Sequence, residues 1–343
     1  MQVINKKLIK KAQHMVFVAI AIMFLSHRDL AQGTRPTPGP ETAAGWSKFS
    51  GNPVLGKGLG SVFDVFVMKE GRKYRMYFSW REKKAIALVE SDDGIHWSNP
   101  ILVFEAIKDS DWEPDVNRPA VVKRDDGYHM WYTGQVWDDT TTGRAWIGYA
   151  TSPDGVHWKR VSDRPVLTGD LPWEDDCIIC PHVIWDDVNK QYRMWYSGGG
   201  NWEPKAIGYA TSTDGIHWNK LASNPIFKPD PSHYWEKERV GGQQVVFHNG
   251  WFYMFYIGYP NLDHAQVGIA RSKDGITNWQ RLSENPIIRT SPDANAVDHN
   301  AIYKPFAVWD GKQWLLWYNG RTKLLEQIDL ATHPGEDLGF KDR

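Results

Sequence analysis

The sequence predicts an all-β protein, a five-bladed β-propeller with four antiparallel strands per blade, closed by an N-terminal strand that completes the last blade. Three observations predict it. A Ser-x-Asp-Gly-x-x-Trp turn recurs about every sixty residues, and its Asp-Gly pairs begin at 93, 154, 214 and 274. Five aromatic strands accompany the repeats, one more than the complete turns. Finally, each chain end carries part of one further repeat, so that together the ends complete a single blade and leave no open sheet edge.

The aromatic strands set the number of blades. A third strand, such as residues 147–151, precedes each turn, and a short outer strand follows the Trp of the turn. Residues 328–332 resemble the third strand of a fifth repeat, and residues 46–53 match its missing outer strand. The aromatic strands cover residues 74–78, 128–132, 192–196, 252–256 and 314–318.

The repeated turns are interpreted as scaffold rather than as chemistry. Asp and Gly suit a tight turn, Ser can bond to the backbone, and the Trp can pack between neighbouring blades. The Asp residues of these turns are therefore not catalytic candidates.

The composition agrees with short aromatic strands joined by turns. The 343 residues include 19 Trp, 14 Tyr and 13 Phe beside 30 Gly and 20 Pro, and aromatic residues favour strands whereas Gly and Pro favour turns. Forty Lys and Arg residues against 41 Asp and Glu give a net charge of −1. This balance argues against a nucleic-acid-binding protein.

The N-terminal region predicts export. Four lysines precede an apolar run over residues 15–25 that is too short to span a bilayer. We expect a signal peptide at 1–32, a proline-containing linker at 33–44 and the propeller at 45–343, which makes the protein secreted or periplasmic with no transmembrane domain in its mature form. We also expect a monomer or a weak oligomer.

The two cysteines, Cys177 and Cys180, are predicted to be buried thiols. Residues three apart in an extended strand point to opposite faces, which is unfavourable for a disulfide. A zinc site would need more ligands than this motif supplies.

Functional side chains are expected at the entrance of each blade, because the innermost strands of a propeller line its central funnel. All five of these entrances carry acidic residues. The five segments are residues 63–66, 112–119, 173–182, 235–239 and 298–305.

Several of these motifs resemble a known family. The repeated turns, the lone Asp64, Trp-Glu-Pro-Asp at 112–115 and Pro-His-Val at 181–183 resemble glycoside hydrolase family 43 and its propeller relatives in families 32, 68 and 130. The resemblance implies a glycosidase that cleaves oligo- or polysaccharides, furanosides among them, with paired carboxylates in the funnel.

The resemblance also implies roles for individual acids. Asp64 corresponds to the general base of an inverting enzyme or the nucleophile of a retaining one, and Glu238 is the candidate general acid with Glu236 as its rival. On blade three the family Asp before Pro-His is replaced by Cys180. Asp176, just upstream, is the candidate for the residue that tunes the acid.

Further funnel residues are candidates for binding the substrate. Polar and charged side chains could hold hydroxyls or an acidic sugar, and a Trp could stack on a sugar ring. For single members a structural role competes with binding, such as an ion pair of Arg118 with Asp115. The candidates are Asp115, Asn117, Arg118, His182, Arg239, His299, Lys304 and Trp173.

The sequence leaves three functions open. The leading one is a secreted glycoside hydrolase that needs no cofactor, although a structural cation such as calcium in the central channel is compatible with it. The second is a phosphorylase like those of family 130, in which basic residues would hold phosphate. The third is a carbohydrate-binding propeller without turnover. In each case the partner is a carbohydrate.

Overall fold

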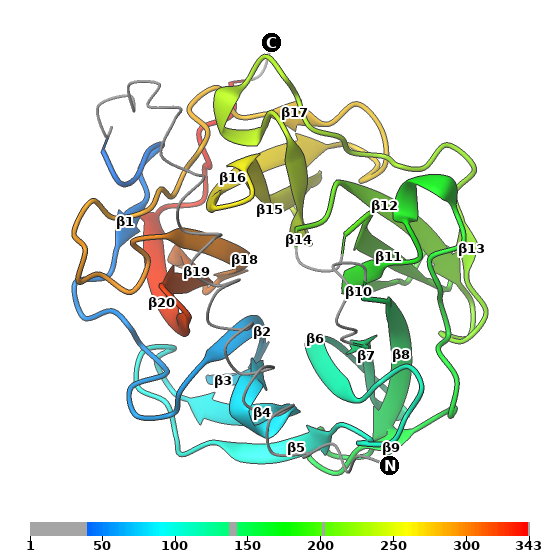
Figure 1. Cartoon of the computed structure of the whole chain (residues 1–343). Coiled ribbons are helices and arrows are strands. Elements are labelled where there is room, and N and C mark those ends of the chain that lie inside the picture. The colour runs from blue at the N-terminus through cyan, green and yellow to red at the C-terminus, as the bar shows by residue number, and fades with distance from the viewer. Residues whose placement is uncertain (1–39, 137–142, 201–202, 342–343) are drawn as a thin grey trace, which may run out of the picture. The chain divides into compact units, whose positions relative to one another are not determined.

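The computed structural model describes residues 40–136, 143–200 and 203–341. Within these residues five antiparallel sheets of four strands each are arranged around a common centre (Figure 1), which confirms the predicted propeller. Residues Pro40–Arg343 form one compact unit. The expected signal peptide, residues 1–32, lies outside the described residues.

The blades follow one another along the chain. Blade one consists of β2 (Val62–Glu70), β3 (Lys73–Trp80), β4 (Ala85–Ser91) and β5 (Ile101–Glu105). Blade two consists of β6 (Asp115–Arg124), β7 (Gly127–Gln135), β8 (Ala145–Ser152) and β9 (Lys159–Arg160). Blade three consists of β10 (Ile178–Asp186), β11 (Gln191–Gly198), β12 (Ala206–Ser212) and β13 (Asn219–Lys220). Blade four consists of β14 (Arg239–His248), β15 (Trp251–Asn261), β16 (His264–Ser272) and β17 (Gln280–Arg281). Blade five consists of β18 (Ala301–Trp309), β19 (Gln313–Thr322), β20 (Leu325–Pro334) and β1 (Ser47–Lys48).

Three short 3-10 helices interrupt the connections between strands. They are η1 (Arg81–Lys83), η2 (Pro172–Glu174) and η3 (Tyr234–Glu236). None of the described helices is long and apolar enough to cross a membrane.

The ring is closed by the predicted N-terminal strand. Strand β1 pairs antiparallel with β20, with Ser47 opposite Thr332 and Lys48 opposite Ala331. The ring of Trp46, which is 3% exposed, lies edge-on to Phe255 of blade four at 6.0 Å. The two chain ends therefore share one sheet, as the repeat pattern predicts.

Each Ser-x-Asp-Gly turn is held by hydrogen bonds within the turn and also forms a hydrogen bond with the preceding blade. In the first turn Asp93 Oδ1 accepts the N–H groups of Ile95 and His96, both at 2.8 Å. The carbonyl of Gly94 accepts the indole N–H of Trp317 from blade five at 2.9 Å. In the other three turns the Gly carbonyl likewise accepts a hydrogen bond from an aromatic side chain of the preceding blade. The donor and acceptor pairs are Tyr77 and Gly155, Trp131 and Gly215, and Trp195 and Gly275. The turns thus connect neighbouring blades, which is the predicted structural role.

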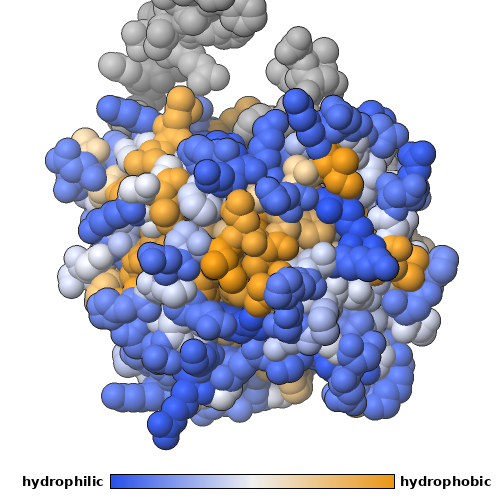
Figure 2. Space-filling view, turned by 90° about the horizontal axis from the view of Figure 1, so that it is seen from below, coloured by the Kyte–Doolittle hydropathy of each residue, from blue (hydrophilic) through white to orange (hydrophobic). Residues whose placement is uncertain are grey.

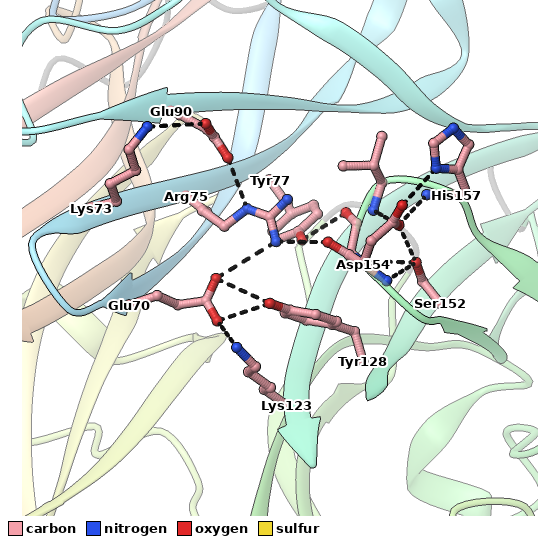
Figure 3. A network of polar contacts seen from close by, with 12 residues as sticks. Glu70, Lys73, Arg75, Tyr77, Glu90, Lys123, Tyr128, Ser152, Asp154 and His157 are labelled. Carbon is pink, nitrogen blue, oxygen red and sulfur yellow. Dashed lines mark hydrogen bonds and ion pairs between the residues drawn. The ribbon is translucent and has the colours of Figure 1, made fainter. Parts of the chain in front are cut away.

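Figure 3 shows one junction between blades in detail. Glu70 of β2 accepts a hydrogen bond from the hydroxyl of Tyr128 at 2.9 Å and forms an ion pair with Lys123 at 2.7 Å, both from blade two. Arg75 of β3 donates to the backbone carbonyl of Asp154, in the turn of blade two, at 3.0 Å. Polar contacts therefore accompany the aromatic packing between blades one and two.

A buried carboxylate recurs inside the blades. Glu113 accepts a hydrogen bond from the hydroxyl of Tyr132 at 2.8 Å and one from Arg160 Nε, also at 2.8 Å. Blades three and four repeat it with Glu174, Tyr196 and Lys220, and with Glu236, Tyr256 and Arg281. In blade five Asp298 takes this place, between Tyr318 and Lys48. Each set joins the blade entrance, the second strand and the outer strand, so these acids hold the blade together.

The outer surface mixes polar and apolar residues. Figure 2 shows apolar residues gathered between polar ones on the face seen from below. Exposed apolar side chains also occur on the outer strand of blade one, β5, where Ile101 and Leu102 are 47% and 43% exposed.

Candidate active site

The inner strands carry a bulge at one common position. The register of each inner strand shifts against its neighbour there, and the central bulge residue has a positive φ of 52° to 59°. A positive φ is uncommon for residues other than Gly, and a bulge redirects a side chain out of the regular alternation. The five bulge residues are Asp64, Arg118, Cys180, Gly242 and Lys304.

These five residues meet at the centre of the propeller. The strands that carry them, β2, β6, β10, β14 and β18, surround the axis (Figure 1). All five residues line a cavity of about 340 Å³. The bulges therefore place one residue from every blade in the same cavity.

Polar side chains of neighbouring blades hold the bulges in place. The backbone N–H of Asp64 donates to Asn319 Oδ1 at 3.1 Å, and that of Arg118 donates to Ser79 Oγ at 3.0 Å. The N–H of Cys180 donates to Thr133 Oγ1 at 3.3 Å. Each acceptor lies on the second strand of the preceding blade, so the packing of the blades fixes the backbone conformation at the cavity.

Asp64 is the acid at the centre of this arrangement. It is 4% exposed, its Oδ2 lies 3.5 Å from Arg118 Nε, and among the described residues this oxygen accepts no hydrogen bond. Burial raises the pKa of Asp64, while the charges of Arg118 and Lys304 oppose that rise. The carboxylate is thus buried beside basic groups that favour its ionised form.

Arg118 is held in position by an amide. Its Nη1 donates to Gln135 Oε1 at 2.8 Å, and Asn117 Nδ2 donates to the same oxygen at 2.8 Å. Asn117, Arg118 and Gln135 all line the cavity. Gln135 thus keeps the guanidinium directed toward Asp64.

A second carboxyl enters from the wall of the cavity. Glu203 lies in the loop between β11 and β12 and lines the cavity. Burial raises its pKa, against the opposing charges of Arg321 and Arg239. Its backbone carbonyl accepts a hydrogen bond from Arg239 Nη1 at 2.7 Å. Arg239 therefore supports the loop that carries Glu203.

A further acid of the cavity is fully paired. Glu326 accepts hydrogen bonds from the hydroxyl of Tyr303 and from Arg81, and all three residues line the cavity. We therefore assign Glu326 to the structure of the wall.

The structure does not bring the other two predicted acids to the cavity. Glu238 is exposed, and its described hydrogen bond is a backbone one, to the carbonyl of Tyr259 at 3.1 Å. Asp176 is exposed as well, and its Oδ1 accepts the indole N–H of Trp146 at 2.9 Å. Glu236, the rival for the acid, belongs to the buried set of blade four.

Five predicted binding residues also lie outside the cavity lining, and one of them is Arg239, which supports the loop that carries Glu203. His182 donates from Nε2 to the carbonyl of Val245 at 2.8 Å, and burial lowers its pKa to about 3. His299 donates from Nδ1 to the carbonyl of Ser291 at 3.0 Å. The remaining two are Trp173, stacked on the ring of Tyr196 at 6.0 Å, and Asp115, at the start of β6.

The described residues contain neither a disulfide nor a cluster of side chains suited to a metal ion. Cys177 and Cys180 are buried thiols rather than a disulfide, and burial raises the pKa of Cys177 to about 12. The described part of the chain holds no group of three or more His, Cys, Asp or Glu side chains suited to a metal ion. A structural cation such as calcium in the central channel stays a prediction.

Sequence reasoning did not identify Glu203, Gln135 or the basic residues Arg81 and Arg321 as part of the cavity. Gln135 and Arg321 lie on the second strands of their blades, and Arg81 and Glu203 lie in the connections between second and third strands. In an antiparallel blade that connection lies at the same end as the entrance to the inner strand. The Gly-rich stretch at 198–200 is the signal that could have drawn attention to the loop.

Comparison with known proteins places the chain among carbohydrate-active propellers. The profile of a family described as glycosyl hydrolases family 43 matches residues 50–339. An uncharacterized protein of Mycobacterium tuberculosis is 26% identical over 226 residues, 60% of this chain and 72% of that protein. A β-1,2-mannobiose phosphorylase of Thermoanaerobacter is 28% identical over 163 residues, 44% of this chain and 52% of the phosphorylase. The crystal structure of a thermostable family-43 glycoside hydrolase shares the fold, with a TM-score of 0.64 and 18% identity over 85% of this chain and 97% of that one.

Proposed function

The chain belongs to glycosyl hydrolase family 43, and from this premise we propose that its central cavity cleaves glycosidic bonds of oligo- or polysaccharides with Asp64 and Glu203. The observation that carries the proposal is the position of Asp64. It is the one acid among the five bulge residues, and it lies beside Arg118.

The chemistry requires two carboxyls in opposite protonation states. A protonated carboxyl donates to the leaving oxygen, and an ionised one acts at the opposite face of the anomeric carbon. Asp64 is proposed for the ionised role, because its Oδ2 forms an ion pair with Arg118 Nε at 3.5 Å. Glu203 is proposed as the proton donor, because burial raises its pKa and it lines the same cavity.

Two observations favour phosphorolysis as a second candidate. A β-1,2-mannobiose phosphorylase is among the relatives, and Arg118 and Lys304 lie beside Asp64 in the cavity. In that reaction a phosphate oxygen bonds to the anomeric carbon, the bond to the leaving sugar breaks, and the acid gives its proton to the leaving oxygen. Release of sugar that requires added phosphate would identify this reaction.

We also propose that the protein is exported with the help of residues 1–32. The support is the lysine-rich start and the apolar run that follows it. The mass of the protein recovered outside the cytoplasm tests this, because cleavage near residue 32 predicts a correspondingly shortened chain.

Dependence on the leaving group tests the role of Glu203. With aryl glycosides, Glu203→Gln should lower kcat/KM by about 10² to 10⁴-fold when the leaving phenol is a poor one. The loss should be small for a dinitrophenyl glycoside, whose leaving group needs no proton. An equal loss on both substrates would remove Glu203 from the role of acid.

Glu238→Gln provides the comparison, since Glu238 is the other candidate acid and is exposed outside the cavity. We expect its kcat/KM to stay within about twofold of the wild type on both substrates. A leaving-group dependence in Glu238→Gln instead of Glu203→Gln would transfer the role of acid to Glu238.

A further inference from the structure

Lys304 is a buried lysine that forms no ion pair with any of the described residues. It is 2% exposed and lines the cavity, and among the described residues its Nζ forms no hydrogen bond and no ion pair. Burial lowers its pKa. A buried ammonium that lacks a counter-ion is unfavourable for stability, so its position in the cavity calls for an explanation.

Two half-buried lysines of the propeller are paired. Lys220 Nζ lies 2.6 Å from Glu174, and Lys48 Nζ lies 2.6 Å from Asp298. The side chains of both lysines are at least 10% exposed, so Lys304 is the more deeply buried of the three. Where a lysine serves the scaffold, this fold supplies a carboxylate within hydrogen-bond distance.

The charges around Lys304 leave a positive excess. Arg118 lies 3.5 Å from Asp64, and this single carboxylate stands against two basic groups. The whole cavity lining repeats the imbalance, with five Lys and Arg residues against four Asp and Glu. One negative charge on a ligand would balance the group formed by Asp64, Arg118 and Lys304.

We propose that Lys304 and Arg118 form an anion subsite that binds the carboxylate of an acidic sugar in the substrate. This inference rests on the proposed function, because it assigns the substrate class of the same cavity. A carboxylate carries a single charge and accepts charge-assisted hydrogen bonds from Lys and Arg. A phosphate dianion matches the site less well, because the nearby Asp64 carboxylate would repel its second charge.

Matched pairs of substrates test the subsite through turnover. Each pair consists of an aryl glycoside of a neutral hexose and the corresponding aryl uronide, which differ only in a CH₂OH or a carboxylate at C6. For the pair that the enzyme accepts, we expect kcat/KM to be at least about tenfold higher for the uronide, equivalent to about 1.4 kcal/mol. Lys304→Met should abolish this preference by lowering kcat/KM for the uronide at least about tenfold more than for the neutral sugar, and Lys304→Arg should retain much of it.

Thermal unfolding tests the subsite without turnover. The free sodium salts of glucuronic, galacturonic, mannuronic and guluronic acid are compared with their neutral hexoses and with inorganic phosphate. At least one uronate should raise the Tm of the wild-type protein and leave that of Lys304→Met unchanged. The unliganded Lys304→Met protein should be at least as stable as the wild type, because the substitution removes a buried unpaired charge.

The two measurements separate the subsite from the proposed reaction. Stabilisation by a uronate that depends on Lys304, in a protein that releases no sugar, would support the subsite and contradict the proposed function. Turnover without preference for uronides and without a uronate-dependent Tm would overturn the subsite and leave the proposed function standing. Stabilisation by phosphate alone would also overturn it, because the anion would then be free phosphate rather than part of the sugar.

Discussion

Asp64 illustrates how one backbone irregularity produces a candidate catalytic group. In a regular strand its side chain would alternate with those of its neighbours, but the bulge with φ of 55° brings it to the cavity. Strained backbone of this kind often accompanies functional sites. Arg118, at the equivalent bulge of blade two, then offsets the cost of burying the carboxylate.

The pH profile of catalysis should report the effect of Arg118 on the ionisation of Asp64. Asp64 must be ionised to act; burial raises its pKa, and the positive charge of Arg118 opposes that rise. Removal of that charge raises the pKa of Asp64, so in Arg118→Met the acidic limb of log kcat/KM should move to higher pH. Lys304→Met should move the limb in the same direction by a smaller amount, because the charge of Lys304 has the smaller effect on Asp64.

The measurement is kcat/KM from about pH 3 to pH 9, with intact folding checked at each pH. A limb that stays in place, or that moves to lower pH, would show that Arg118 does not act on the ionisation of Asp64.

At the scale of single elements, the blade entrances combine two roles that look alike in sequence. Glu113, Glu174 and Glu236 follow a Trp at the entrance of their blades, yet each is held inside its blade by a Tyr hydroxyl and a basic residue of the outer strand. The bulge residues lie several positions further on and face the cavity. Entrance acids thus stabilise the blade, and bulge residues form the site.

Stability measurements should separate these two roles. Lys220→Met leaves Glu174, whose side chain is 0% exposed, without the ammonium that contacts it at 2.6 Å. An uncompensated buried carboxylate should lower the free energy of unfolding by about 3 kcal/mol. Kinetic parameters at 25 °C should remain close to those of the wild type, because Lys220 does not line the cavity.

Urea unfolding of Lys220→Met beside Lys304→Met provides the comparison. The structure predicts a loss of stability in the first variant and none in the second, although both remove the charge of a lysine. Equal losses would mean that Lys304 has a structural partner after all.

The fold could be predicted from the sequence, whereas only part of the site could. Turn residues such as Asp93 and Gly94 act through contacts within a few residues, so a repeat of short motifs was enough to predict five blades. The bulges are backbone irregularities that leave no periodic signal in the sequence. Glu236 is bound by Tyr256 and Arg281, which lie 20 and 45 residues further along the chain. For this reason the sequence predicts that Asp64 faces the funnel, but it predicts neither the pairing of Glu236 within its blade nor the position of Glu203 in the cavity wall.

At the scale of the whole propeller, stability depends on closure of the ring. Blade five draws its outer strand β1 from the N-terminal side, and Trp46 packs there against Phe255 of blade four. An open ring would expose the edge of β20 and separate the walls of the cavity.

Removal of this contact should destabilise the entire unit. Trp46 is 3% exposed, and truncation of a buried Trp costs about 3 to 5 kcal/mol, so Trp46→Ala should lower the free energy of unfolding by that amount. Denaturant unfolding followed by Trp fluorescence and by circular dichroism measures the change. A loss below about 1 kcal/mol would mean that the N-terminal strand is not needed for closure.

The central claim is that the cavity formed by the five bulge residues is a glycosidase active site in which Asp64 acts. The most direct test is sugar release from a panel of glycans and aryl furanosides, pyranosides and uronides, with and without phosphate, by the wild-type protein and by Asp64→Asn. The account predicts release without phosphate by the wild type and a loss of about 10² to 10⁴-fold in the variant, with its Tm retained. Wild-type rates in a folded Asp64→Asn protein would contradict it.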